Sequence, residues 1–125
     1  RRDVSARTEL GCPHFAGVFA LGASVELMQS IGIKNIESRA LELNRYLTDC
    51  LNDAGWRVLS PLGEEVFRSA ETLVATETPA GVVAALAERK IFVTEKPEGI
   101  RVATDFFNNE DDINKLIEGL HACRS

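Results

Sequence analysis

One arginine is the strongest candidate for chemistry in this sequence. Arg101 follows the turn-forming run Lys96-Pro97-Glu98-Gly99 and lies in a segment, residues 100–104, that alternates apolar and polar residues. This alternation predicts a half-buried strand. A guanidinium fixed on a strand is preorganised to bind a carboxylate through two parallel hydrogen bonds. Periodicity alone also allows an arginine on the solvent-facing side of a sheet.

The other titratable residues do not form a recognisable constellation. His14 and His121 are far apart in the sequence and lack companion ligands, so we expect surface or capping roles. The acidic pairs at 64–65 and 111–112 are adjacent residues, which do not converge on one face of a helix. We therefore expect solvated charges there, not a catalytic pair.

The sequence also lacks the common cysteine-based and glycine-rich motifs. Cys12, Cys50 and Cys123 are widely spaced, with no CxxC pair and no zinc-finger spacing to the histidines. An odd number of scattered cysteines favours the reducing cytoplasm. The sequence contains no P-loop, GxGxxG or GxSxG motif.

Composition places the chain among ordinary globular proteins. It has 125 residues, 45% hydrophobic and 26% charged, which suits one compact core and not two domains. The net charge is −5, and no basic stripe interleaved with aromatic residues is present, so we expect no nucleic-acid partner. The longest weakly polar stretch, 15–27, is too short to cross a bilayer, so we expect no membrane partner. The chain begins Arg1-Arg2 without an initiator methionine, which suggests that it belongs to something longer.

Apolar periodicity and turn residues predict eight elements. Helices are expected over 13–31, 33–54, 78–90 and 109–124, and strands over 56–59, 72–76, 91–94 and 100–104. The order α, α, β, β, α, β, β, α disfavours a doubly wound parallel sheet. We predict an α+β fold, with a small sheet of about four strands, mainly antiparallel or mixed, and helices packed mainly on one face. The first helix is apolar nearly all round, so we expect part of it to face a partner surface.

Two segments resemble a known family. The run Arg7-Thr8-Glu9-Leu10-Gly11-Cys12-Pro13-His14 is similar to the R-F-E-x-G-T-P-N segment of class V aminotransferase-like enzymes. The run from Gly99 to Ile113, G-I-R-V-A-T-D-F-F-N-N-E-D-D-I, resembles their C-terminal G-I-R-x-S-x-x-x-Y-N-T-x-x-D-I segment. These are fold type I enzymes that use pyridoxal phosphate (PLP), and include cysteine desulfurases, selenocysteine lyases, kynureninases and isopenicillin epimerase-like proteins.

The resemblance implies that the chain is the C-terminal small domain of such an enzyme, residues 14–125, preceded by an arm, residues 1–13, that leads from a large domain. In the family the large domain carries the Schiff-base lysine and most of the cofactor site. None of the four lysines here matches that lysine, so we expect the chain alone to be inactive and to hold no PLP. The full-length enzyme would bind PLP and an amino-acid substrate and would form a homodimer.

The resemblance implies roles for individual residues. Arg101 matches the arginine that binds the substrate α-carboxylate. Gly11, Cys12 and His14 match the segment that reaches the cofactor phosphate of the partner subunit, although Cys12 and His14 replace its threonine and asparagine. No cysteine lies between residues 91 and 101, which disfavours desulfuration and leaves aminotransferase, lyase and epimerase reactions open. A different class of function, a stand-alone module that binds a partner protein or a small carboxylate, is the alternative.

Overall fold

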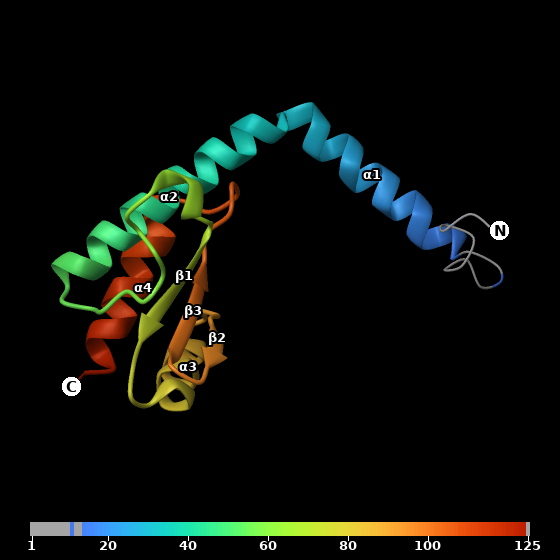
Figure 1. Ribbon diagram of the computed structural model, residues 1–125. Coiled ribbons are helices and arrows are strands. Elements are labelled where there is room, and N and C mark those ends of the chain that lie inside the picture. The colour runs from blue at the N-terminus through green and yellow to red at the C-terminus, as the bar shows by residue number, and fades with distance from the viewer. Residues whose placement is uncertain (1–10, 12–13, 125) are drawn as a thin grey trace, which may run out of the picture. The chain divides into compact units, whose positions relative to one another are not determined.

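The computed structural model describes residues 11 and 14–124, apart from the side chain of residue 65 (Figure 1). The chain divides into two units, Arg1–Ile33 and Lys34–Ser125, and each is described by itself. The predicted boundary between an arm, 1–13, and a domain, 14–125, falls on residues outside the description. It therefore stays a prediction.

The first unit contains the apolar helix α1, Phe15–Ile31. Gly32 ends it as predicted, with a φ of +93° that suits glycine, and its N–H donates to the carbonyl of Met28 at 2.9 Å. No residue of α1 is buried, and Phe19 is 77% exposed. None of the described residues of this unit buries the apolar surface of the helix. The expected partner surface for the helix stays a prediction.

Helix length and hydropathy decide whether a helix could cross a membrane. Within residues 14–124 no single helix is both long enough and apolar enough to cross a membrane. Helix α1 meets those two criteria only when it is counted together with the next helix across the break at Gly32.

The second unit contains all of α2, Ile33–Asp53, except its first residue, and this helix is amphipathic as the sequence predicts. The chain turns away from it at Gly55, where φ is +69°. The N–H of Trp56 donates back to the carbonyl of Leu51 at 2.8 Å, which satisfies one of the last carbonyls of the helix. A loop with a short 3-10 turn, Glu65–Phe67, leads on to the sheet.

The sheet has three strands, β1 (Glu71–Ala75), β2 (Thr94–Lys96) and β3 (Gly99–Ala103), in the order β1-β3-β2 and antiparallel throughout. The fold class is as predicted, but the number of strands is three and not four.

Two of the expected strands are wrong in detail. Residues 56–59 form one bridge, Val58 to Val74, flanked by two backbone hydrogen bonds to β1, because Pro61 follows and ends the extended segment. Residues 91–93 are unpaired and β2 starts only at Thr94. The N–H of Ile91 is used to close the end of the preceding helix, by donating to the carbonyl of Leu86 at 3.0 Å, so the chain is still leaving that helix where the strand was expected.

Two more helices complete the fold: α3, Pro79–Glu88, and α4, Glu110–Ala122. Asn109 caps α4 as predicted, in a reciprocal capping box with Asp112. Thr78 precedes Pro79 as expected, but its side chain makes no capping hydrogen bond.

The helices of this unit cover one face of the sheet, as Figure 1 shows for α2 and α4. The buried core consists of Trp56 and apolar side chains from α2, α3 and α4 against Val74 of β1 and Ile100 and Val102 of β3. Leu43, Leu47, Leu51, Leu86 and Leu120 are fully buried. The strand residues in between, including Leu73 and Arg101, lie on the opposite face, which no helix of this unit covers.

Candidate functional site

Arg101 lies in the middle of β3, the central strand, on the open face of the sheet. It pairs with Leu73 of β1 on one side and with Thr94 of β2 on the other. Paired residues of antiparallel strands point to the same face, so Leu73 and Thr94 flank the arginine. The side chain of Arg101 is 37% exposed, held at its base by the sheet and open at its end.

Glu71 is the fixed partner of this arginine. It pairs in register with Ala103, so it lies diagonally from Arg101 on the same face, within reach of a long side chain. Nη1 of Arg101 lies 3.3 Å from Oε1 of Glu71 and 3.5 Å from Oε2. One nitrogen therefore serves both oxygens. No other hydrogen bond or ion pair of Arg101 to the described residues is present, which leaves the Nε and Nη2 edge of the guanidinium available.

The arginine opens into a hollow of about 320 Å³. The other polar groups that line it are Ser60, Ser69, Lys96 and Glu98. With Glu71 and Arg101 the hollow contains two basic and two acidic side chains, so its net charge is zero. Such a lining suits a zwitterion, with a carboxylate directed at the free edge of the arginine.

The same hollow does not fit PLP by itself. A phosphate would face Glu71 and Glu98, and among the lining residues there is no aromatic ring on which a pyridine could stack. The lining of this hollow therefore suits a carboxylate better than it suits PLP. No group of three or more histidine, cysteine, aspartate or glutamate side chains within residues 14–124 could hold a metal ion.

The residues expected near a cofactor phosphate belong to the other unit. Gly11 is exposed, with a φ of +92°, and His14 is exposed at the start of α1 without a side-chain capping bond. Cys12 lies outside the described residues. Gly11 and His14 are described within Arg1–Ile33 and Arg101 within Lys34–Ser125. The expected contact of Gly11, Cys12 and His14 with the cofactor phosphate of the partner subunit stays a prediction.

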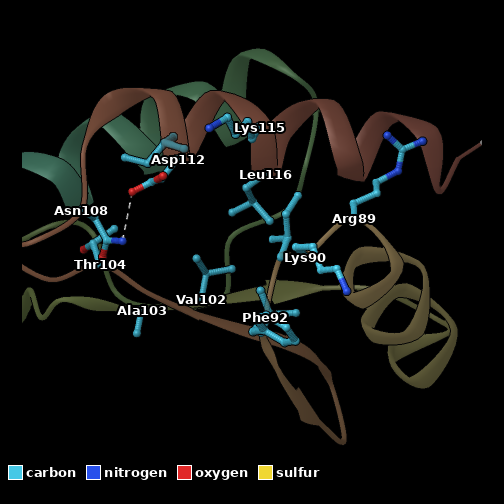
Figure 2. Close-up of a pocket in the computed structure, with 13 residues that line it drawn as sticks. Arg89, Lys90, Phe92, Val102, Ala103, Thr104, Asn108, Asp112, Lys115 and Leu116 are labelled. Carbon is cyan, nitrogen blue, oxygen red and sulfur yellow. Dashed lines mark hydrogen bonds between the residues drawn. The ribbon is translucent and has the colours of Figure 1, made fainter.

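A second, larger hollow lies on the other side of β3, and sequence reasoning missed it (Figure 2). Its volume is about 520 Å³, and Val102 of β3 and Leu116 of α4 form part of its wall. Lys90 and Phe92 line it from the segment between α3 and β2. No signal in the sequence indicated it, because a lysine near a helix end is ordinary and the positive φ of Lys90 is visible only in the structure.

An ion pair holds the start of α4 to α2. Nη1 and Nη2 of Arg39 donate to Oε1 and Oε2 of Glu110 at 3.0 and 3.1 Å, and Glu42 accepts a third bond at 3.1 Å. The hydrogen bonds from Arg39 lower the pKa of Glu110 below its usual range, and those from Glu110 and Glu42 raise the pKa of Arg39. The loop from β3 into α4 is thereby anchored at its far end.

Comparison with known proteins gives two findings. The family model of aminotransferase class-V matches residues 1–116. The apo structure of a cysteine desulfurase from Thermococcus onnurineus NA1 is similar in fold, with a TM-score of 0.83 at 17% sequence identity. The match covers 93% of this chain and 32% of that chain, so the chain spans about a third of the length of the solved structure. No curated protein matches the chain.

Proposed function

Because the chain belongs to the class-V aminotransferase family, we propose that it is the C-terminal small domain of a PLP-dependent enzyme that transforms an amino acid, and that Arg101 binds the substrate α-carboxylate. The observation that carries this proposal is the free Nε and Nη2 edge of Arg101 above an uncovered sheet face. An amino acid is a zwitterion, which suits a hollow that has both signs of charge.

Arg101 would act by orientation. The Nε–H and Nη2–H bonds are parallel, so they can donate to both oxygens of one carboxylate and fix its plane. The ion pair with Glu71 restrains Nη1 and limits rotation of the guanidinium, which keeps the fork directed at the hollow. PLP, held by the remainder of the enzyme, would supply the electron sink for breaking a bond at the substrate α-carbon.

The finer assignments rest on the family resemblance. Gly11, Cys12 and His14 would contribute to the phosphate site of the partner subunit in a homodimer. Cys50 and Cys123 are free thiols, which supports a cytoplasmic location. The desulfurase likeness extends to the fold alone, and the absence of cysteine between residues 91 and 101 favours an aminotransferase, lyase or epimerase reaction.

The test is Arg101→Lys in the PLP-containing enzyme, with a primary-amine or keto-acid readout over a panel of amino acids. A lysine ammonium keeps the charge but cannot reproduce the fork, so we expect KM to rise about 30- to 160-fold, the equivalent of one lost bidentate contact at about 2–3 kcal/mol. Arg57→Lys, an exposed arginine of the same unit, is the matched control and should leave KM unchanged. Unaltered kinetics in R101K would refute the assignment.

A second measurement addresses the chain alone. Mixed with PLP, the 125-residue chain should give no stoichiometric visible band that one Lys→Ala change removes. Such a band would show that this chain contains its own cofactor lysine, contrary to the proposal.

A further inference from the structure

The hollow on the far side of β3 from Arg101 has the size and lining of a small-molecule site. Ligand pockets commonly measure about 300–1,000 Å³, and this one is about 520 Å³. Figure 2 shows Val102 and Leu116 facing each other across its middle, with Phe92 beside Val102. Val102 and Leu116 form the apolar floor of the hollow. Phe92 is 81% exposed, so its large ring lies uncovered beside this floor.

Positive charge dominates the rim. Arg89 and Lys90 lie at one end of the hollow in Figure 2, and Lys115 lies on the α4 side. None of the three forms an ion pair with a described residue. The one lining carboxylate, Asp112, already accepts hydrogen bonds from the backbone of Asn109 and the side chain of Asn108. A cationic rim in a chain of net charge −5 is complementary to an anion.

The backbone at Lys90 is held in a conformation that favours glycine. Its φ is +63°, the only positive value at a non-glycine residue among those described. The N–H of Lys90 donates to the carbonyl of Ala87 and that of Ile91 to Leu86, both at 3.0 Å, which is the hydrogen-bond pattern of a helix end that usually has glycine at this place. A lysine here is unfavourable for folding, and strain of this kind is concentrated at functional positions.

The edge of β3 contributes two backbone polar groups to the hollow. Thr104 donates to Ala70 on the β1 side, so by the alternation of an antiparallel ladder the N–H and C=O of Ala103 point to the opposite edge. Pairing with β2 stops at Arg101, and Ala103 lines the hollow. A backbone donor and acceptor are therefore available beside the apolar floor.

We propose that this hollow binds a small organic anion, a carboxylate on a flat apolar body, with the carboxylate at the Arg89–Lys90 end and the body between Phe92, Val102 and Leu116. The proposal does not depend on the role of Arg101, which points to the other face of the sheet.

The probe is naphthalene-2-carboxylate, and its neutral isostere naphthalene-2-carboxamide is the matched ligand. In a ¹H–¹⁵N NMR titration of the purified protein we expect the carboxylate to shift amides of residues 89–93, 102–104 and 115–116. The carboxamide should bind at least fivefold more weakly. Added salt should weaken the binding of the carboxylate and leave the binding of the carboxamide unchanged.

Lys90→Gly is the decisive variant, because it removes the cation and relieves the backbone. We expect its melting temperature to rise while its affinity for the carboxylate falls at least threefold, a combination that misfolding cannot produce. Phe92→Ser should also lose affinity, and Lys34→Gln, on α2, should bind as the wild type does. Equal affinity for both ligands, shifts confined to α1, or an unchanged dissociation constant in K90G would each overturn the proposal.

Discussion

Gly99 is the residue at which a single added methyl group should do most damage to this sheet. It begins β3 and pairs with Ala75 of β1. A Cβ built on Gly99 would lie 1.9 Å from the carbonyl oxygen of Val74, where real contacts of this kind exceed 3.0 Å. The atom that it meets is backbone, which cannot rotate away as a side chain would. Gly99→Ala must therefore separate β1 from β3 at the start of β3, two residues before Arg101.

The cost can be worked from that displacement. Overpacking of this kind costs about 1–3 kcal/mol, and the loss of a backbone hydrogen bond at the Ala75 end adds about 1 kcal/mol. We expect the free energy of unfolding to fall by about 2–4 kcal/mol. For a chain of this length that lowers the melting temperature by roughly 8–16 °C.

Thermal unfolding followed by circular dichroism is the assay, with urea titration to obtain the free energy. Gly63→Ala is the matched control, because nothing lies within 4 Å of its built Cβ, and it should stay within 1 °C of the wild type. A G99A protein as stable as G63A would refute the close approach of β1 and β3 and the register that follows from it.

Two further predictions concern side-chain contacts at the two ends of α4. The pKa of Glu110 is lowered by Arg39, so the stability that this carboxylate contributes is present above its unfolded pKa of about 4.3 and is lost as the pH falls through its lower folded pKa. The melting-temperature gap between wild type and Glu110→Gln should therefore shrink on acidification from pH 6 to pH 3, and a constant gap would contradict the pairing. The guanidinium of Arg124 lies 3.8 Å from the ring centroid of Trp56 and donates to the carbonyls of Ala54 and Gly55 at 2.9 and 2.8 Å. Arg124→Ala should destabilise the fold by about 1–2 kcal/mol and shift the emission of this single tryptophan to longer wavelength, whereas an unchanged spectrum would count against the contact.

Local sequence rules predicted the helices well because each end is set by its own residues. Gly32 and Gly55 end α1 and α2 at positive φ, and Asn109 with Asp112 opens α4 by a reciprocal cap. These signals act within a few residues of each other. They need no knowledge of the tertiary fold.

The strands were harder because their pairing is not local. Residues 91–93 are good strand formers, yet the closing of α3 at Lys90 carries them away from β3 before pairing begins at Thr94. The position of Arg101 on a strand was predictable from alternation. Its contact with Glu71 was not, because it depends on a register between residues 30 positions apart in the sequence.

The outer edges of the three-stranded sheet have a consequence for handling the protein. One edge of β1 is occupied by residues 57–59, whose backbone exchanges two hydrogen bonds with it. The other edge is β2, only three residues long and containing Glu95 and Lys96. Short, charged or covered edges give a second chain little to extend by strand addition, the usual start of fibrous aggregation. If the purified chain self-associates, the cause should be sought in the uncovered apolar surface of α1. Mild detergent should then reverse the association more effectively than a change of ionic strength.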